Sequence, residues 1–267
     1  MDFRQNITPL ILTRNEAPNI ARTMAKLAWA SDVVIVDSLS DDDTLDILSR
    51  FKQVRVFRRR FDSHAKQWSY GLAETGIRTD WVLALDADFV LSDALVEELA
   101  CLDPGDQVSG YEARFRYLVF GRPLRGSLYP PVNVLFRVNR ARYVQDGHTQ
   151  RVVVTGKVNH LKSWIFHDDR KPLSSWLSSQ DSYMKLEAAH IARQAWAELG
   201  AADRIRRLIW VSPFLVFAYS LLVQGTLLDG RAGLFYALQR MLAECLLALR
   251  LLEASILTRQ GEGDQEL

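Results

Sequence analysis

The chain has 267 residues, of which 48% are hydrophobic and 24% are charged, a composition that supports an ordinary globular core and excludes wholesale disorder. The 33 basic residues balance the 32 acidic ones to a formal charge of +1, so the chain as a whole does not attract a polyanion such as nucleic acid. Cys101 and Cys245 have no neighbouring Cys or His at zinc-ligand spacing. This spacing argues against a structural zinc and against a disulfide framework.

The first hundred residues alternate short apolar runs with helix-like stretches, which predicts β-α-β units around a mostly parallel sheet with helices on both faces. The predicted strands cover 7–12, 33–36, 54–57 and 81–85, and the predicted helices cover 19–27, 65–73 and 92–99, with a further helix beginning at Leu45. Aromatic and β-branched pieces with Gly and Pro between them predict a mixed or antiparallel region over 103–166. Helical patterning returns after Pro172 and continues to the end of the chain.

The stretch 208–228 contains no charged residue and is just long enough for a membrane span of about 20 residues. Pro213 and Gly225 interrupt it, however, and the helix that follows carries Arg240 and Glu244. We therefore expect attachment at a membrane interface rather than a spanning hairpin, with packing on the rest of the chain or on a partner as the alternative. Because no secretory signal is visible at the start, we expect a cytoplasmic location.

Polar residues follow three of the predicted strands, at 13–16, 37–41 and 86–88, where open parallel sheets bind ligands. Asp86 and Asp88 flank one alanine directly after a buried strand, so each carboxylate raises the pKa of the other unless a cation neutralises them. Mg²⁺ or Mn²⁺ on a substrate diphosphate suits such oxygen ligands. Two aspartates after a strand are also common in turns and helix caps, so this tripeptide alone does not decide between the two interpretations.

Three segments in this order resemble glycosyltransferase family 2, whose members have the GT-A fold: ILTRNE at 11–16, VIVDSLSDDDT at 34–44 and LDAD at 85–88. The resemblance is strongest over 7–95. Within the family, the sequence looks most like the branch that contains bacterial lipopolysaccharide-core and exopolysaccharide glycosyltransferases. It implies a Rossmann-like α/β catalytic domain over 1–172, with a nucleotide-binding half at 1–102 and an acceptor half at 103–172. The helical region 173–267 would then contact a membrane or a partner.

The resemblance implies an inverting, metal-dependent transfer of sugar from a nucleoside diphosphate sugar, with UDP as the favoured nucleotide. The expected acceptor is a lipid-linked glycan of the lipopolysaccharide or exopolysaccharide type, at the cytoplasmic face of a bacterial inner membrane. The Gln-x-x-Arg-Trp signature of processive members is absent, so we expect addition of one sugar. A catalytically silent scaffold subunit is the alternative, and a nucleotidyltransferase is disfavoured because the loop at 13–17 lacks glycine.

Site residues follow from the same resemblance. Thr13, Asn15 and Glu16 match the loop that borders the nucleotide, Asp37 matches the acid that meets the base, and Gln67 lies where family members line the donor pocket. The alternative is that these side chains only cap helices or face solvent.

The metal ligands implied by the family are Asp88, which bridges to the diphosphate, and Asp86, which lies near the ribose and the metal. His167 resembles the histidine that often completes the metal shell, although a structural histidine is the alternative. The segment RYVQDGH at 142–148 resembles the one that carries the catalytic base, which makes Asp146 the expected base. Gln145 departs from the usual acidic residue before the base, and His148 is the alternative proton acceptor.

Overall fold

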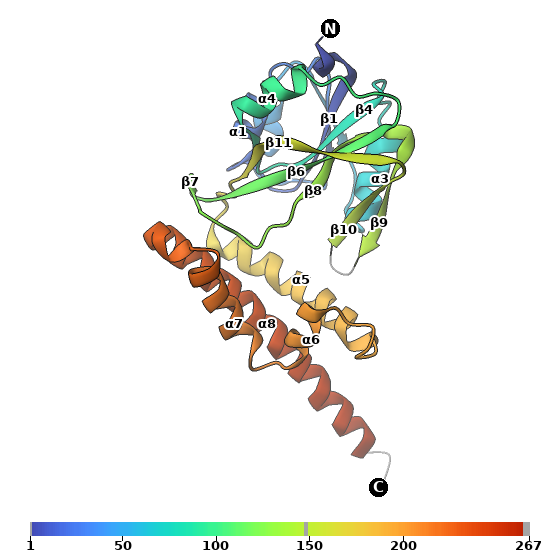
Figure 1. The fold of residues 1–267 in the computed structure, drawn as a ribbon. Helices are drawn as coiled ribbons and strands as arrows, with labels where there is room; N and C mark the ends of the chain where they lie inside the picture. The colour runs from blue at the N-terminus through green and yellow to red at the C-terminus, as the bar shows by residue number, and fades with distance from the viewer. Residues whose placement is uncertain (1, 147–148, 264–267) are drawn as a thin grey trace. The chain divides into compact units, whose positions relative to one another are not determined.

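The computed structural model describes residues 2–146 and 149–263. The chain divides into two compact units. The first unit comprises the chain up to Pro123 together with Tyr129–Lys171, and the second comprises Leu124–Leu128 together with the chain from Pro172 onward. The first unit contains the strands and the second is helical (Figure 1).

The first unit is built, in its described residues, on one sheet with the strand order β3-β2-β1-β4-β8-β6-β11-β5, and β7 pairs with β6. The strands of this sheet are β1 (Ile7–Thr13), β2 (Val33–Asp37), β3 (Val54–Arg58), β4 (Trp81–Asp86), β5 (Phe89–Leu91), β6 (Val108–Val119), β7 (Arg122–Pro123), β8 (Val132–Arg137) and β11 (Lys157–His167). The first four strands along the sheet are parallel, as the β-α-β pattern predicts. Strand β8 runs antiparallel between β4 and β6, and β6 is parallel to β11.

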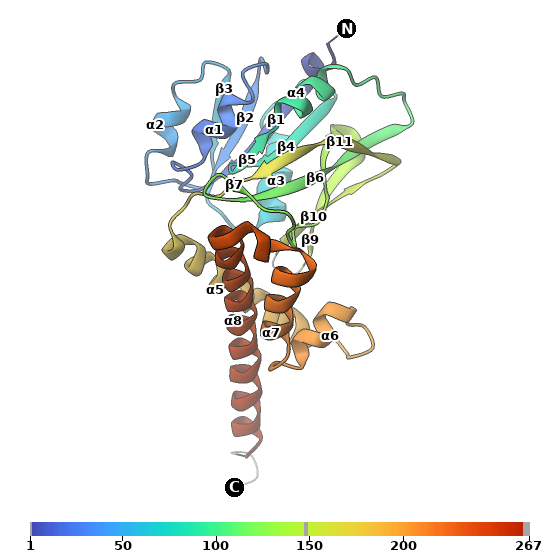
Figure 2. The ribbon, with the colours of Figure 1, turned by 60° about the vertical axis from the view of Figure 1, so that its left-hand side comes forward.

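Helices cover both faces of the parallel half (Figures 1 and 2). One face packs against α1 (Ile20–Ala25), α2 (Thr44–Leu48) and α4 (Asp93–Ala100), and the other packs against α3 (His64–Glu74). Alternate residues of β1 enter the two cores because strand side chains alternate between faces. Ile7 and Ile11 lie in the core with α1, whereas Leu10 lies in the core with Trp68 of α3.

Two shorter features complete the first unit. The strands β9 (Ala141–Asp146) and β10 (Thr149–Val154) form an antiparallel hairpin, and its Tyr143 stacks on Trp68 with ring centroids 5.2 Å apart. Single turns of 3-10 helix occur at η1 (Phe3–Asn6) and η2 (Val138–Arg140). The predicted class, an α/β fold with a mostly parallel sheet, helices on both faces and a helical C-terminal region, is confirmed.

The second unit consists of α5 (Leu173–Arg193), α6 (Ala201–Arg207), α7 (Ser212–Ala218), the π-helical turn η3 (Tyr219–Val223), the 3-10 turn η4 (Thr226–Asp229) and α8 (Gly230–Gly263). Ile191 of α5 and Leu247 of α8 are almost fully buried in its core. The stretch 208–228 is therefore divided among short elements rather than forming one helix. Within 2–146 and 149–263, no helix combines the length and the apolarity that crossing a membrane requires.

Candidate active site

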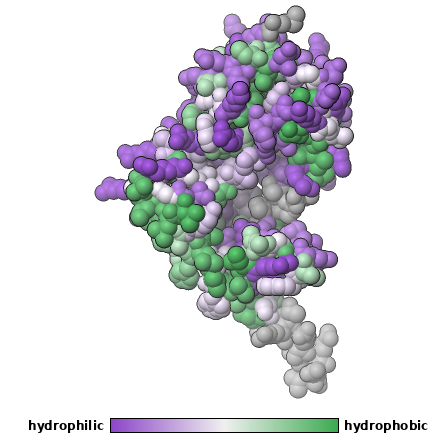
Figure 3. Space-filling view, in the orientation of Figure 1, coloured by the Kyte–Doolittle hydropathy of each residue, from purple (hydrophilic) through white to green (hydrophobic). Residues whose placement is uncertain are grey.

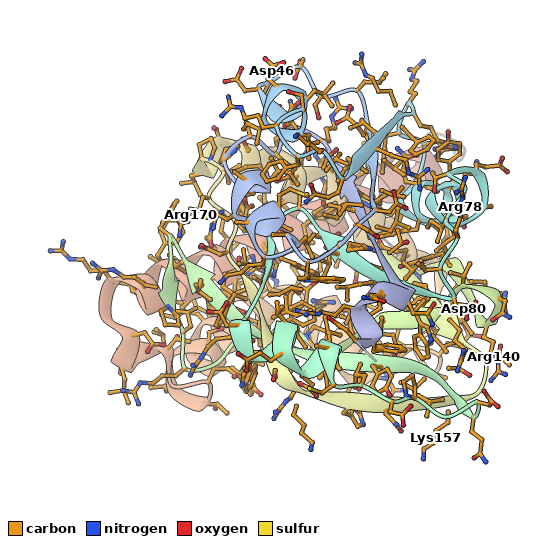
Figure 4. All side chains as sticks on the ribbon, turned by 90° about the horizontal axis from the view of Figure 1, so that it is seen from above. Asp46, Arg78, Asp80, Arg140, Lys157 and Arg170 are labelled. Atoms are coloured by element: carbon orange, nitrogen blue, oxygen red, sulfur yellow. The ribbon has the colours of Figure 1, made fainter. Side chains whose placement is uncertain are left out.

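The candidate site lies at one edge of the sheet, where the carboxyl ends of several strands meet. Strands β1, β2, β4, β6 and β11 all point the same way, because β8 reverses the direction between β4 and β6. Figure 4 shows Asp80, just before β4, and Lys157, at the start of β11, on one side of the unit, and Arg170, just past the end of β11, on the other. The polar residues after these strands are thus brought to the edge opposite Asp80 and Lys157.

At the ends of β1 and β2, the predicted residues Thr13 and Asp37 form a hydrogen-bonded pair. They are register partners in the parallel ladder, and the Thr13 hydroxyl donates to Asp37 Oδ1 over 2.9 Å. The backbone N–H of Ser40 donates to Asp37 Oδ2 over 2.9 Å, and its hydroxyl donates to Oδ1 over 2.5 Å. Asp37 is fully buried, so its carboxylate holds the loop after β2 against the end of β1.

Asn15 joins the loops after β1 and β2 to each other. Its side chain donates to Asp41 Oδ1 over 2.7 Å and accepts from the backbone N–H of Asp41 over 3.0 Å. Asn15 and Leu39 have φ values of 54° and 62°, in the left-handed region that costs energy for residues other than glycine and is unusual for a bulky side chain such as Leu39. Strained backbone of this kind is concentrated at functional sites.

Gln67 of α3 holds the loop after β2 by a hydrogen bond to Ser38. It is fully buried, and its amide nitrogen donates to Ser38 Oγ over 2.8 Å and to the Arg59 carbonyl over 3.2 Å. The Arg59 guanidinium donates to the Gln67 carbonyl oxygen. Gln67 therefore lies beside the predicted nucleotide site, and its contacts within the chain orient Ser38 and Arg59.

At the ends of β4 and β11, Asp86, Asp88 and His167 converge. The Nε2 atom of His167 lies 3.0 Å from Oδ2 of Asp88, and both side chains are mostly buried. The turn between the aspartates is held from two sides, because the Thr23 hydroxyl of α1 donates to the Ala87 carbonyl over 2.7 Å and the Asp168 N–H donates to the Asp88 carbonyl over 3.1 Å. The two carboxylates are thus presented on a braced turn.

The two aspartates are electrostatically unequal. Burial, followed by the charge of Asp88, raises the pKa of Asp86 to about 6. Burial also opposes ionisation of Asp88, but the charge and the hydrogen bond of His167 outweigh it and lower the pKa of Asp88. The pKa of His167 is raised, because Asp88 outweighs the effect of burial on the imidazole. The cluster therefore carries more negative charge than His167 alone neutralises.

A divalent cation fits this donor set in part. Among the described residues, the buried Nδ1 of His167 has no hydrogen-bond partner, and the carboxylate oxygens of the cluster suit Mg²⁺ and Mn²⁺. In the described part of the chain, no group of three or more His, Cys, Asp or Glu side chains is arranged to hold a metal ion by itself. Mg²⁺ sites that use one or two carboxylates complete their shell with substrate phosphates and water, so the residues present suit an ion that arrives with a diphosphate.

The structure adds Lys171 to the site, a residue that the sequence did not single out. Its Nζ atom lies 2.6 Å from Glu16 Oε1. Burial alone would lower the pKa of Lys171, but Glu16 and Asp169 raise it, so the ammonium stays charged at neutral pH. Burial raises the pKa of Glu16 to about 7, although Lys171 opposes that rise. Glu16, which the sequence predicts in the nucleotide loop, thus forms a largely buried ion pair with Lys171 near Asp88.

Asn19, at the start of α1, is a second residue that the sequence did not single out. It is fully buried, and its amide donates to Glu16 Oε2 and to Asp169 Oδ1, each over 2.8 Å. Its carbonyl oxygen accepts from the Arg170 N–H over 2.9 Å and from Arg22 over 2.8 Å. Asn19 therefore ties the loop after β1 to the segment after β11, which places Lys171 beside Glu16.

The hairpin carries the predicted base. Burial, followed by the charge of Asp86, raises the pKa of Tyr143 well above its usual value, so Tyr143 of β9 lies in the electrostatic range of the site. Asp146 is the last residue of β9, and its backbone pairs with Thr149. The side chain of Asp146 and the whole of His148 lie outside the described residues, so the assignment of Asp146 as base stays a prediction.

Residues 10–102 match the family model of glycosyl transferase family 2. The match spans β1 to α4 and includes the three segments that resemble the family. Among curated proteins, the chain is 24% identical over 205 residues to an uncharacterized glycosyltransferase of Rickettsia prowazekii, covering 71% of this chain and 69% of the relative. A glycosyltransferase of Rickettsia bellii, also uncharacterized, is 28% identical over 148 residues, which are 54% of this chain and 49% of the relative.

Solved structures with some similarity include residues 1–349 of TarS from S. aureus in complex with UDP-GlcNAc. It is 16% identical, has a TM-score of 0.48, and the alignment covers 96% of this chain and 92% of that one. GalNAc-T7 with UDP, GalNAc and Mn²⁺ is 12% identical with a TM-score of 0.43, and the alignment covers 76% of this chain and 50% of that one.

Proposed function

We propose that this protein is an inverting glycosyltransferase that moves one sugar from a nucleoside diphosphate sugar, with UDP as the nucleotide, to an acceptor hydroxyl. The observation that carries the proposal is the meeting of Asp86, Asp88 and His167 at the edge of a sheet whose first half matches glycosyl transferase family 2. Asp88, with Asp86 and His167 beside it, would hold Mg²⁺ or Mn²⁺, which would offset the charge of the departing diphosphate.

The chain's own groups supply the rest of the donor site. Lys171 adds a fixed positive charge near Asp88, and such a charge stabilises a leaving diphosphate that gains negative charge in the transition state. Thr13, Asp37 and Asn15 hold the loops after β1 and β2 in one arrangement. A preformed arrangement lowers the entropy that nucleotide binding must offset.

The proposal assigns the proton transfer to Asp146. The acceptor oxygen attacks the anomeric carbon on the face opposite the diphosphate, the bond from that carbon to the diphosphate oxygen breaks, and the hydroxyl proton passes to the carboxylate. The support is the resemblance of 142–148 to the base-bearing segment of the family, together with the influence of Asp86 on Tyr143 three residues earlier in β9. His148 is the alternative acceptor of the proton.

For the acceptor, we propose a lipid-linked glycan of the lipopolysaccharide or exopolysaccharide type, used at the cytoplasmic face of a bacterial inner membrane. The resemblance of the motifs to that branch of the family supports this class of acceptor. The absence of the processive signature supports addition of a single sugar.

Calorimetric titration with UDP, GDP and dTDP, each with Mn²⁺ and with EDTA, tests the donor site without knowledge of the acceptor. We expect UDP to bind only in the presence of Mn²⁺, and Asp88→Asn to weaken that binding at least about a hundredfold, because the carboxylate that would hold the ion is lost. If no nucleotide binds under either condition, the glycosyltransferase proposal is wrong.

Asp146→Asn separates binding from catalysis. We expect UDP affinity to stay unchanged, while turnover, measured as UDP release from the UDP-sugar in the presence of a bacterial glycolipid extract, falls at least about a hundredfold because general-base assistance is lost. Full turnover in this variant would assign the proton to another group, with His148 the next to test. Tight UDP binding without turnover in the unaltered protein would instead favour the scaffold alternative.

A further inference from the structure

The second unit contains a stretch in which the exposed side chains are apolar and most of the polar side chains are buried. Residues 208–228 include α7, η3 and the first part of η4, and none of them is charged. Every residue of this stretch that is exposed is apolar or aromatic: Leu208, Trp210, Val211, Phe214, Leu215, Ala218, Tyr219, Leu222, Val223, Leu227 and Leu228. Figure 3 shows the hydrophobic side chains gathered over α7 and the turns that follow it.

Three of the polar residues of the same stretch face inward, and Gln224 is half-buried, with its amide donating to the Tyr219 hydroxyl over 3.2 Å. Ser212, Ser220 and Thr226 are buried. The Ser212 hydroxyl donates to Glu244 of α8, and the Thr226 hydroxyl donates to the Ser220 carbonyl over 2.8 Å. A surface in contact with water shows the opposite distribution, with large apolar side chains inside. The stretch is therefore built to meet an apolar medium on its outer side.

The exposed side chains are large and are held in place by a rigid support. Trp210, Phe214, Leu222 and Leu228 are 74%, 66%, 69% and 70% exposed. On the inner side, α8 packs so closely on η4 that a β-carbon at Gly233 would collide with the Thr226 carbonyl. An apolar patch of this size on a firmly packed surface marks a site of interaction rather than a loosely folded segment.

Charge around the patch points to an anionic lipid surface as the occupant. Arg204 and Arg207 precede the stretch, and the exposed Arg231 follows it at the start of α8. The nearby acids are neutralised inside the unit, because Glu244 pairs with Arg206 over 3.1 Å and Asp229 pairs with Arg125 over 3.4 Å. The border of the patch is therefore cationic, which suits lipid phosphates.

The geometry also decides how deeply the patch would enter a bilayer. The contiguous α7 and η3, with seven and five residues, rise about 18 Å at roughly 1.5 Å per residue, less than the roughly 30 Å of a hydrocarbon core. Trp210 and Tyr219 are the side chains that favour the interface between lipid and water. We propose that residues 208–228 dock this protein on the surface of an anionic bilayer, with α7, η3 and η4 lying in the interfacial layer.

This inference does not depend on the proposed donor, and the two can fail separately. If both hold, docking brings the enzyme to a layer where a lipid-linked acceptor is concentrated. A second copy of the chain is the competing occupant, because an apolar face can also be covered by its own equivalent in a symmetric dimer.

Flotation of the full chain with vesicles tests the proposal. We expect the protein to float with vesicles of equimolar phosphatidylcholine and phosphatidylglycerol and to bind phosphatidylcholine vesicles more weakly. The double variant Phe214→Ser and Leu222→Ser should lower the partition coefficient by about a hundredfold, since each buried side chain of this size contributes roughly a factor of ten. Both side chains are mostly exposed, so the variant keeps the packing of the unit, and an unchanged circular dichroism spectrum checks this.

Two matched substitutions sharpen the test. Trp210→Ser should lower vesicle binding by about tenfold, whereas Trp196→Ser, which removes a 51% exposed indole outside the stretch, should leave it unchanged. Arg231→Gln should weaken binding to the anionic vesicles by about fivefold and leave binding to phosphatidylcholine unchanged.

Three results would overturn the proposal: no flotation of the unaltered protein, equal flotation of the double variant, or equal losses for Trp196→Ser and Trp210→Ser. A dimer in sedimentation that dissociates in the double variant, without vesicle binding, would assign the face to a second copy. Nucleotide titration of the double variant should match that of the unaltered protein, which separates loss of docking from loss of the donor site.

Discussion

Two clusters of polar side chains lie at the same edge of the sheet, and they differ in how their groups are partnered. In the β1–β2 cluster, made of Thr13, Asp37, Ser38, Ser40 and Gln67, the Asp37 carboxylate accepts hydrogen bonds from within the chain and the Gln67 amide nitrogen donates one to Ser38 Oγ. In the β4–β11 cluster, made of Asp86, Asp88 and His167, two carboxylates converge, and the Nδ1 atom of His167 has no hydrogen-bond partner in the part of the chain that the structure describes.

This difference indicates a structural role for the β1–β2 cluster and a ligand-binding role for the β4–β11 cluster. A fully partnered buried cluster stabilises one loop arrangement, whereas converging like charges cost stability until a ligand neutralises them. We therefore expect substitutions in the β1–β2 cluster to reduce stability first, and those in the β4–β11 cluster to reduce ligand binding first.

The largest expected effect on stability belongs to Lys171, which stands between the two clusters. Lys171→Met should lower the free energy of unfolding by about 3 kcal/mol at pH 9, where Glu16 is charged in the unaltered protein, because it leaves the largely buried carboxylate of Glu16 without its cation. Urea denaturation monitored by tryptophan fluorescence measures this change.

Lys26→Met is the matched control for Lys171→Met. Lys26 pairs with Asp93 over 2.5 Å, but the Asp93 side chain is 82% exposed, so the loss should stay below about 1 kcal/mol. Equal losses in the two variants would show that the pair of Lys171 and Glu16 behaves as a surface pair, and the electrostatic description of the site would need revision.

The pH dependence of stability gives the second test. The pKa of Glu16 rises from 4.5 to about 7 on folding, so between these values the folded state binds more protons than the unfolded state. Stability from this group is therefore present below pH 4.5 and is lost as the pH rises to 7, by up to about 3 kcal/mol. Glu16→Gln should remove this slope, which is measured as the difference in unfolding free energy between the variant and the unaltered protein across that range. A difference that stays constant with pH would contradict the raised pKa.

Much of the site could be predicted from the sequence, because its main residues follow strands directly. Asp86 and Asp88 come after an unbroken apolar strand, and Asp37 comes after another, so the edge where they meet follows from the parallel sheet alone. His167 ends the last strand of the first unit in the same way, and its position resembles that of the histidine in the family.

The remaining residues of the candidate site are brought there by contacts between distant parts of the chain, which the sequence alone does not predict. Lys171 meets Glu16 from 155 positions away, and Asn19 meets Asp169 from 150 positions away. Asn19 reads in sequence as an ordinary residue near a helix start, since nothing local indicates that its amide is buried. Likewise, the apolar character of 208–228 was evident, but its outward orientation depends on the π-helical and 3-10 turns, which shift the periodicity.

The same isosteric change in each cluster tests the comparison directly. Asp37→Asn should destabilise the protein by about 2 kcal/mol, because the carboxylate accepts from Thr13 and twice from Ser40, and an amide replaces one acceptor oxygen with a donor. Thermal or urea unfolding measures the loss. A neutral result would mean that Asp37 does not hold the loop and is available to a ligand.

Asp86→Asn should change the stability in the opposite direction to Asp37→Asn. Because the folded protein raises the pKa of Asp86 from 3.8 to about 6, the charged form opposes folding above pH 6, and removing that charge should stabilise the protein by about 1 kcal/mol at pH 7 in EDTA. The gain should shrink as the pH falls from 6 to 4, since the carboxyl of the folded protein is then already neutral. Adding Mn²⁺ and UDP should reverse the order, because a ligand that binds only the unaltered site stabilises only that protein. Destabilisation by Asp86→Asn in EDTA, equal to that of Asp37→Asn, would mean that both clusters are structural, and the distinction between support and chemistry would fail.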